Sequence, residues 1–451
     1  MIRTFRSLRV RNYRLFASGQ VVSLTGTWMQ RVGQDWLVTQ LTHTSGTALG
    51  ITTGLQFLPV LLFGLYGGVI ADRFPKRRLL VATQSTMAAL ALVLGLLVVT
   101  GEVRLWEVYL LAFGTGMCTA VDNPTRQAFV AEMVGADEVV NAVGLNSATF
   151  NLARIVGPAL GGLMIAVLGG RTGPLFLLNA SSYGAVLACL WAMRESELFD
   201  PGRRVARATG QLRAGLAYVR HRPLLYLPSI LVGVVGTLGF NFQITLVLID
   251  RSVFHLGAGA YGLLSATLAV GSLGGAIVAA RRTRPTARLL VGAALAFGAF
   301  EVLAGSMPSY LALALMLVPT GVASLSFTAT ANTSVQLASD PAMRGRVMGL
   351  YMLVFLGGTP IGAPLVGWLA SAAGPRWSLW IGGGASALAA LGVAAVLAFQ
   401  GGSRPGAEAL GEGEGPPEVA RPLVAASGLV AAQGLAGGGA GATGAGDSTA
   451  A

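Results

Sequence analysis

The chain has 451 residues, of which 53% are hydrophobic and only 11% charged, and its mean hydropathy is +0.66. Soluble domains carry about 25% charged residues, so this composition excludes an ordinary soluble protein and indicates that lipid surrounds most of the chain. The net charge of +12 does not indicate a nucleic-acid partner, because the basic residues form short clusters between apolar runs, the pattern typical of membrane proteins.

Long apolar runs divide the chain into regular segments. A helix needs about 20 apolar residues to cross the hydrocarbon core of a bilayer. Twelve runs reach about this length, and we predict that each is a transmembrane helix: 14–38, 47–70, 79–100, 105–124, 142–168, 173–193, 223–249, 258–280, 289–306, 310–332, 347–372 and 377–399. The sequence therefore predicts an all-α membrane protein.

The basic residues predict how these helices are oriented. With the N-terminus in the cytoplasm, 23 Lys and Arg residues fall in segments on the inner side and four in outer loops. Because cytoplasmic loops are enriched in Lys and Arg, we expect a multi-pass protein of the bacterial inner (plasma) membrane with both termini in the cytoplasm.

The longest predicted link, residues 194–222, divides the chain into residues 1–193 and 223–399. From about residue 400 the sequence is mainly Gly, Ala, Pro and Glu, with too few large apolar residues to build a core. We therefore expect two membrane domains of six helices each, a cytoplasmic central loop, and a disordered cytoplasmic tail over 400–451.

A weak internal repeat relates the two domains. Several glycines of the first domain recur 207 positions later, among them Gly50, Gly67 and Gly68, which recur as Gly257, Gly274 and Gly275. Pro158 and Gly161 recur as Pro364 and Gly367 at an offset of 206. A parallel repeat of this kind indicates two pseudo-symmetric six-helix bundles, an internal symmetry found in transporters.

The turn after the second predicted helix combines small residues with charges. Gly64 and Gly68 make a small-x-x-x-small face on which a neighbouring helix can approach closely, and Asp72 stands among the basic residues Arg73, Lys76 and Arg77. This stretch resembles the signature loop of the major facilitator superfamily, although Pro75 replaces its second glycine.

The resemblance implies a gating role for this loop. In that superfamily the acid docks against the start of the eleventh helix, where this chain carries Arg344 and Arg346. The alternative is that Asp72 and its basic neighbours only fix the topology.

The fifth predicted helix carries a second motif. Pro158 removes a backbone donor, and its glycines leave a smooth groove for packing. The motif resembles one typical of the antiporter branch of the same superfamily, and consists here of Arg154, Gly157, Pro158, Gly161 and Gly162. Arg154 is a buried-arginine candidate that could meet an acidic substrate, a carboxylate such as Asp122, or neighbouring carbonyl groups.

Three ionisable residues inside predicted helices are candidates for proton coupling. Arg31 and Asp35 are four residues apart in the first helix and share a face. Charges at this depth are costly, so they usually serve a function. Asp35 is either a proton carrier or half of a static ion pair with Arg31, and Glu301 in the ninth helix is a further candidate.

A polar cluster marks the inner end of the fourth predicted helix. Pro124 and its charged neighbours are expected to end this helix. Asp122 and Arg126 are four residues apart and are expected to pair and help to close the inner mouth.

Motifs for enzyme chemistry are missing from the sequence. It has no phosphate-binding Gly-x-x-x-x-Gly-Lys-Ser/Thr loop, and its three histidines are scattered without metal-ligand spacing. We expect no enzymatic activity, cofactor or metal site.

Beyond the two motifs, residues 28–37, 122–130 and 146–158 are similar to a bacterial exporter branch of the superfamily that contains the enterobactin exporter family. The resemblance implies a central cavity between helices 1, 4, 7 and 10, with substrate contacts expected from Gln30, Gln34, Asn241, Gln243, Thr330 and Asn332. It also implies a secondary active transporter that works as a monomer and exports small drug-like or siderophore-like molecules, with proton antiport as the driving force. The alternatives are an uptake symporter of the same fold and a membrane sensor without transport activity.

Overall fold

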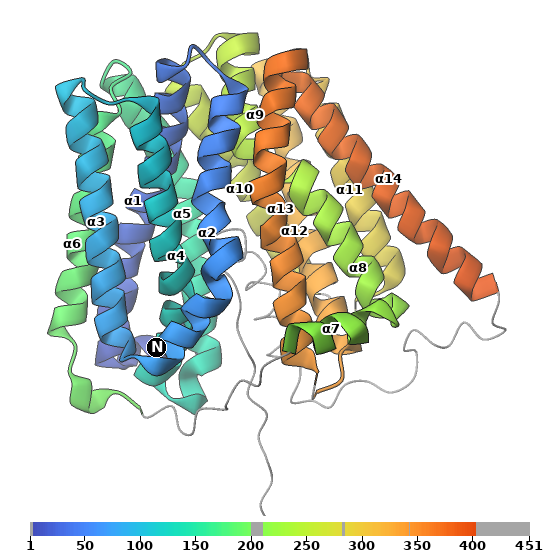
Figure 1. The fold of residues 1–451 in the computed structure, drawn as a ribbon, viewed down its shortest axis with the longest axis horizontal. Coiled ribbons are helices and arrows are strands. Elements are labelled where there is room, and N and C mark those ends of the chain that lie inside the picture. The colour runs from blue at the N-terminus through green and yellow to red at the C-terminus, as the bar shows by residue number, and fades with distance from the viewer. Residues whose placement is uncertain (1–2, 200–210, 282–284, 342, 403–451) are drawn as a thin grey trace, which may run out of the picture.

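The computed structural model of the chain describes residues 3–199, 211–281, 285–341 and 343–402. Most of these residues form helices that run side by side (Figure 1). The first six are α1 (Arg11–Leu41), α2 (Gly46–Arg73), α3 (Lys76–Thr100), α4 (Leu105–Val134), α5 (Val139–Val167) and α6 (Gly173–Ala192). The tail expected after residue 400 lies almost wholly outside the described residues.

The remaining helices are α7 (Gln211–Arg220), α8 (Pro223–Val234), α9 (Phe242–Ile249), α10 (Ala258–Ala280), α11 (Ala287–Gly305), α12 (Tyr310–Ala338), α13 (Arg344–Ala373) and α14 (Pro375–Gly402). The π-helical segment η4 (Val235–Gly239) joins α8 to α9, and a second one, η5 (Asp250–Phe254), extends α9, so that the four elements form one long span. Short 3-10 helices occupy Arg3–Arg9, Ala136–Glu138 and Glu195–Glu197.

Local sequence explains where several helices begin and end. The Ser45 side chain accepts a hydrogen bond from the backbone N–H of Ala48 and so caps α2, and Ser309 caps α12 in the same way. Gly101 ends α3 with a positive φ of 80°, a conformation that favours glycine. These caps lie in the turns opposite the arginine-rich side, which we define by the α2–α3 turn and the N-terminus (Figure 1).

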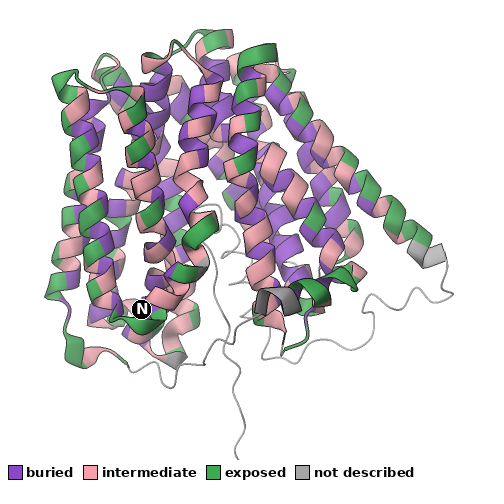
Figure 2. Cartoon of the chain, viewed as in Figure 1, coloured by how far each residue is buried: buried purple, intermediate pink, exposed green. Residues whose placement is uncertain are grey.

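Ten spans in the described residues are long and apolar enough to cross a membrane. Large apolar side chains on the outer faces of α3, α6 and α14 are exposed, for example Val99, Trp191 and Leu388, whereas the buried residues lie between the helices (Figure 2). Lipid is the environment that such faces require. Helices α1 and α4 have 31 and 30 residues but are less apolar, so the full count of twelve spans stays a prediction for these two.

Two predicted helices differ from the structure. The expectation that α4 ends at Pro124 is wrong, because the helix continues to Val134. Pro124 cannot donate to the carbonyl group of Ala120, and at this level α2 presents Gly67, whose missing side chain allows very close approach to that carbonyl. The predicted helix 223–249 is not regular, because Asn241 between η4 and α9 leaves the helical conformation at φ −104° and ψ 30°.

The internal repeat is visible in the packing. Gly67 of α2 lies against α4 at Ala120, and the equivalent Gly274 and Gly275 of α10 lie against α12 at Val322. Thus α2 packs on α4 in the first half as α10 packs on α12 in the second. The close approach expected at Gly64 is absent, since a Cβ atom there would meet only Val60 of its own helix, at 4.0 Å.

Two helix pairs make most of the contact between the halves, α2 with α13 and α5 with α10. A Cβ atom added at Gly50 of α2 would lie 2.9 Å from Cα of Pro364, and one at Gly262 of α10 would lie 2.9 Å from Cα of Gly162. Both contacts lie far from the arginine-rich side. Toward that side the bundles draw apart (Figure 1), and the glycines at the start of α13, Gly345 and Gly349, have open space beside them. The halves are therefore closed on one side and separated on the other.

A methyl group at Gly50 tests the α2–α13 contact. In Gly50→Ala the added Cβ meets backbone atoms of α13, so we expect a loss of about 1–3 kcal/mol, typical of overpacking, and a lower midpoint of thermal unfolding in detergent. Gly349→Ala is the matched control on α13, where nothing lies within 4 Å and no loss is expected. Equal midpoints for the two variants would contradict the contact.

Candidate functional site

A cavity of about 140 Å³ lies between the two halves; we call it the central cavity. Its lining comes from helices of both halves: Trp28, Arg31, Val32 and Asp35 of α1, Thr53 and Phe57 of α2, Arg154 and Pro158 of α5, five residues of α10 beginning at Tyr261, residues 240–244 and Leu246 of the α8–α9 span, Ser324 of α12, and Thr359 of α13. Residues of α4 are missing from this lining, so the expectation that the fourth helix contributes is wrong for this conformation. Helices α2, α5, α10 and α13 contribute instead.

Asp35 connects the halves through a hydrogen bond. The hydroxyl group of Tyr261 on α10 donates to the Asp35 carboxylate at 2.6 Å. Both side chains are buried, at 7% and 1% exposure. Sequence reasoning missed Tyr261, because a tyrosine near a helix end is typical of the membrane interface and gives no signal of a polar partner.

Arg31 forms no ion pair with Asp35 among the described residues, so the static ion pair is not the arrangement in this structure. Its guanidinium carbon lies 4.8 Å from the ring centre of Trp28 and 5.6 Å from that of Phe57. A cation over aromatic faces is attracted by their quadrupoles. Arg31 therefore lies at the cavity wall against aromatic rings and not in direct contact with the Asp35 carboxylate.

The break between α8 and α9 supplies the wall contributed by the seventh span. At this level Gly358 of α13 approaches Thr237, so closely that a Cβ atom at Gly358 would lie 2.7 Å from the Thr237 hydroxyl oxygen. After the break Phe240, Asn241, Phe242 and Gln243 line the cavity. Asn241 and Gln243, two of the predicted substrate contacts, thus line the cavity. Their contact with a substrate stays a prediction.

The other four predicted contacts, Gln30, Gln34, Thr330 and Asn332, do not line the cavity in this conformation. Gln30 instead accepts a hydrogen bond from Asn179 of α6 at 2.6 Å, and the Thr330 hydroxyl donates to the backbone of its own helix. Their role as substrate contacts stays a prediction.

The motif in α5 packs on two helices. Gly161 lies against α1, where a Cβ atom would be 3.1 Å from Cα of Met29, and Gly157 approaches α1 beside Trp28. Gly162 faces α10 of the other half. The motif thus sets how closely α5 approaches both α1 and α10.

Arg154 points from this motif into the cavity. It is 9% exposed, and its Nε and Nη2 atoms are fully buried with no hydrogen-bond partner among the described residues. Neither Asp122 nor a ring of carbonyl groups satisfies it, so two of the three partners suggested by the sequence are wrong. The remaining suggestion, an acidic substrate, stays a prediction.

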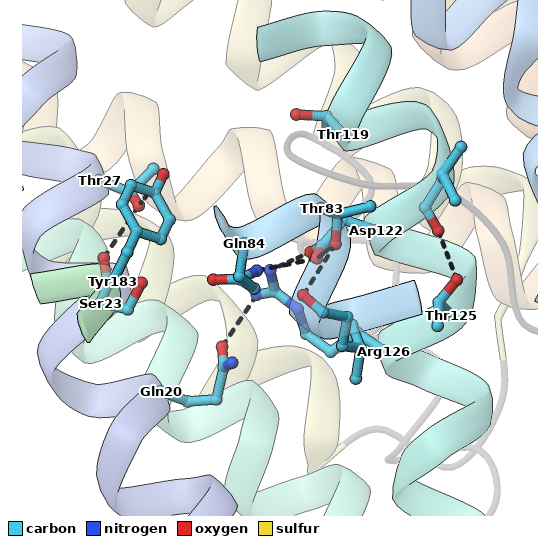
Figure 3. A network of polar contacts seen from close by, with 12 residues as sticks. Gln20, Ser23, Thr27, Thr83, Gln84, Thr119, Asp122, Thr125, Arg126 and Tyr183 are labelled. Carbon is cyan, nitrogen blue, oxygen red and sulfur yellow. Dashed lines mark hydrogen bonds and ion pairs between the residues drawn. The ribbon is translucent and has the colours of Figure 1, made fainter. Parts of the chain in front are cut away.

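Asp122 belongs to a separate polar network inside the first half (Figure 3). Its carboxylate is 1% exposed, pairs with Arg126 as the sequence predicted, and accepts hydrogen bonds from Thr83 at 2.7 Å and Gln84 at 2.8 Å. Arg126 also donates to Gln20 of α1 at 2.9 Å. The network ties α1, α3 and α4 together and does not reach the cavity lining; a role in closing the inner mouth stays a prediction.

The predicted gating loop lies on the arginine-rich side. Lys76 is buried and pairs with Glu132 of α4, and Arg77 pairs with Glu195 at 2.6 Å. Asp72 and Arg73 are exposed. At the start of α13, Arg346 lies beside Gly215 of α7 and Arg344 is half-buried. Contact between Asp72 and the start of α13 stays a prediction for a conformation in which the halves meet on the arginine-rich side.

Two further acids are buried in the second half. Glu301 of α11 is 1% exposed and stands against the backbone of Gly239 and Gly382, outside the cavity lining. Asp250 in η5 is 0% exposed, and neither carboxylate oxygen has a partner among the described residues. Sequence reasoning missed Asp250 because it placed this residue just beyond the predicted helix end.

Solved structures with this arrangement are transporters. A bacterial homologue of the human lysosomal transporter Spinster, inward-facing and occupied, matches with a TM-score of 0.66 at 17% identity, over 87% of this chain and 97% of that one. The nucleoside transporter NupG matches with a TM-score of 0.65 at 13% identity, over 86% and 99%. The chain therefore shares the all-α fold of these two proteins.

Sequence comparison gives the family. The transmembrane secretion effector family matches residues 2–431, and the chain belongs to it. The enterobactin exporter of Shigella flexneri is 24% identical over 79% of this chain and 84% of its own length. The staphyloferrin A transporter of Staphylococcus aureus is 31% identical, but over only 39% of this chain and 44% of its own length.

Removal of the Asp122 carboxylate tests the buried network. In Asp122→Ala, Arg126 loses its acid and Thr83 and Gln84 lose their acceptor, so we expect a loss of about 3 kcal/mol, seen as a lower thermal midpoint in detergent. Glu195→Ala is the control, because this carboxylate is 68% exposed and an exposed pair contributes little. Equal shifts would show that the network does not stabilise the first half.

Proposed function

We propose that the chain exports small organic molecules from a bacterial cell by alternating access, driven by inward movement of protons. The observation that carries this proposal is the central cavity, which both halves line and which is closed on the side away from the N-terminus. The arginine distribution supports a cytoplasmic position for both termini, so the separated side faces the cytoplasm. The name of the enterobactin exporter, similar over most of its length, supports export of siderophore-like compounds.

Asp35 is the proton carrier in this proposal. An ionised carboxylate accepts a stronger hydrogen bond than a neutral one. With Asp35 ionised, Tyr261 therefore holds α10 to α1 and favours closure of the far side. A proton that reaches Asp35 from outside weakens this link, and its release to the cytoplasm restores it. Glu301 remains a second candidate carrier because it is buried beside the break in the seventh span.

The gating loop completes the cycle. When the cytoplasmic side closes, Asp72 is brought to the start of α13, where Arg344, Arg346 and the positive end of the helix dipole favour an anion. The cytoplasm-facing state does not need this contact. The contact therefore stabilises only the conformation that is closed to the cytoplasm.

Neutralising Asp35 tests the coupling. Inside-out membrane vesicles with an imposed pH gradient are offered enterobactin or staphyloferrin A, the compounds named for the two relatives. We expect accumulation that a protonophore abolishes, that Asp35→Asn removes, and that Tyr261→Phe reduces by about tenfold, as the loss of a hydrogen bond to a charged group implies.

The control for this experiment is Arg171→Gln, at an exposed arginine between α5 and α6, and it should transport normally. Proton-driven transport by Asp35→Asn at the wild-type rate would end the coupling role of Asp35. Accumulation in right-side-out vesicles instead of inside-out ones would make the chain an uptake symporter.

Reversing the charge at Asp72 tests the gate. We expect Asp72→Lys to reduce transport in the same vesicles by at least about tenfold, because a cation at this position repels the start of α13. The amount of protein in the membrane, measured by immunoblotting, should stay unchanged. The control Arg171→Gln changes an exposed charge outside the gating loop, and an equal loss in both variants would contradict a specific role for Asp72.

A further inference from the structure

Arg154 is a permanent charge without a partner. Arginine is not deprotonated in proteins and carries five donors, yet two of the guanidinium nitrogens of Arg154 are buried and unpaired among the described residues. Its side chain is more than nine-tenths buried, on α5 in the middle of the membrane-spanning region. A buried charge without a counter-charge is strongly destabilising, so this position requires an anion that arrives from outside the chain.

The charges of the cavity lining also favour an anionic ligand. Two cations, Arg31 and Arg154, line the central cavity against one acid, Asp35. Asp35 already accepts the hydrogen bond of Tyr261 and forms no ion pair with either arginine among the described residues. Asp122 is engaged by Arg126. The cavity therefore has an excess of positive charge that no described acid of the chain cancels.

Four aromatic residues from both halves stand among the apolar residues of the lining. Trp28, Phe57, Phe240 and Phe242 contribute rings to the wall, with Phe57 on the first half and Phe240 and Phe242 on the second. Aromatic walls favour flat rings, which stack edge-to-face or offset on them. A few convergent polar groups among such walls are typical of small-molecule sites.

We propose that Arg154 recognises an anionic group of the transported molecule, and that the substrates of this chain are aromatic organic anions. The guanidinium group holds the anionic group, for example a carboxylate, through paired N–H donors, while the aromatic residues hold the ring. This inference rests on the proposed transport through the central cavity, and it names the class of substrate and the residue that selects it.

The test compares two probes that differ only in charge. Dansylglycine and dansylglycinamide share the same fluorescent aromatic group, and only the first has a carboxylate. Their dissociation constants are measured by fluorescence titration with the purified full-length chain in lipid nanodiscs. We expect the wild type to prefer dansylglycine by about tenfold to hundredfold, the range for hydrogen bonds to charged groups.

Three variants connect the preference to Arg154. Arg154→Gln should remove the preference for the carboxylate and leave binding of the amide within about twofold, which shows that the cavity is still folded. Arg154→Lys keeps the charge but loses the planar fork, so it should keep only part of the preference. Arg171→Gln should behave as the wild type, because this arginine is exposed outside the cavity.

Several outcomes would overturn the proposal: equal binding of acid and amide by the wild type, no binding of dansylglycine, or an unchanged preference in Arg154→Gln. A free chloride ion offers the same charge, so each titration is repeated in gluconate buffer. If chloride stabilises the wild type through Arg154 while the dansylglycine preference does not depend on Arg154, then the residue holds a resident ion and not a substrate. No pH gradient is present, so this result is independent of the direction and coupling of transport.

Discussion

A charged side chain within a bilayer must find a partner, and this constraint organises the structure. In the first half Asp122 is surrounded by Arg126, Thr83 and Gln84, so its charge is neutralised and its network serves stability. Arg154 has no such surroundings, although it is more deeply buried than Arg126. The cost of burial is similar for both arginines. A ligand that pairs with Arg154 therefore gains more binding free energy than one that contacts Arg126.

Backbone contacts between small residues hold the halves together only on one side. Helices α2 and α13, and α5 and α10, meet through glycines, so at these points the backbones of the two halves lie in direct contact. The motif of α5 lies at the centre of this arrangement, because Gly161 faces α1, Gly162 faces α10, and Arg154 lies about two turns earlier on the same helix. A rotation at this contact therefore moves Arg154 relative to the aromatic wall of the other half.

Much of the fold can be predicted from the sequence because a membrane-spanning helix requires an apolar run of nearly fixed length. The apolar runs locate most spans, and the glycine repeat indicates two similar bundles. The failures have local causes. Pro124 does not end α4, because a glycine on the neighbouring helix accommodates the freed carbonyl group of Ala120. The pairing of Asp35 with Tyr261 joins residues 226 positions apart, and nothing in either local sequence indicates the other.

Proton antiport and an anionic substrate place opposite demands on Asp35. Electrostatics alone would favour joint binding, because a proton on Asp35 removes a charge that repels the substrate, by about 2 kcal/mol for charges ~8 Å apart at an effective dielectric constant of ~20. Space acts the other way. Tyr261 and Asp35 both line the cavity, so a substrate that reaches their contact competes with it for space. Export by exchange follows when this steric competition outweighs the electrostatic attraction, and uptake by symport follows when it does not.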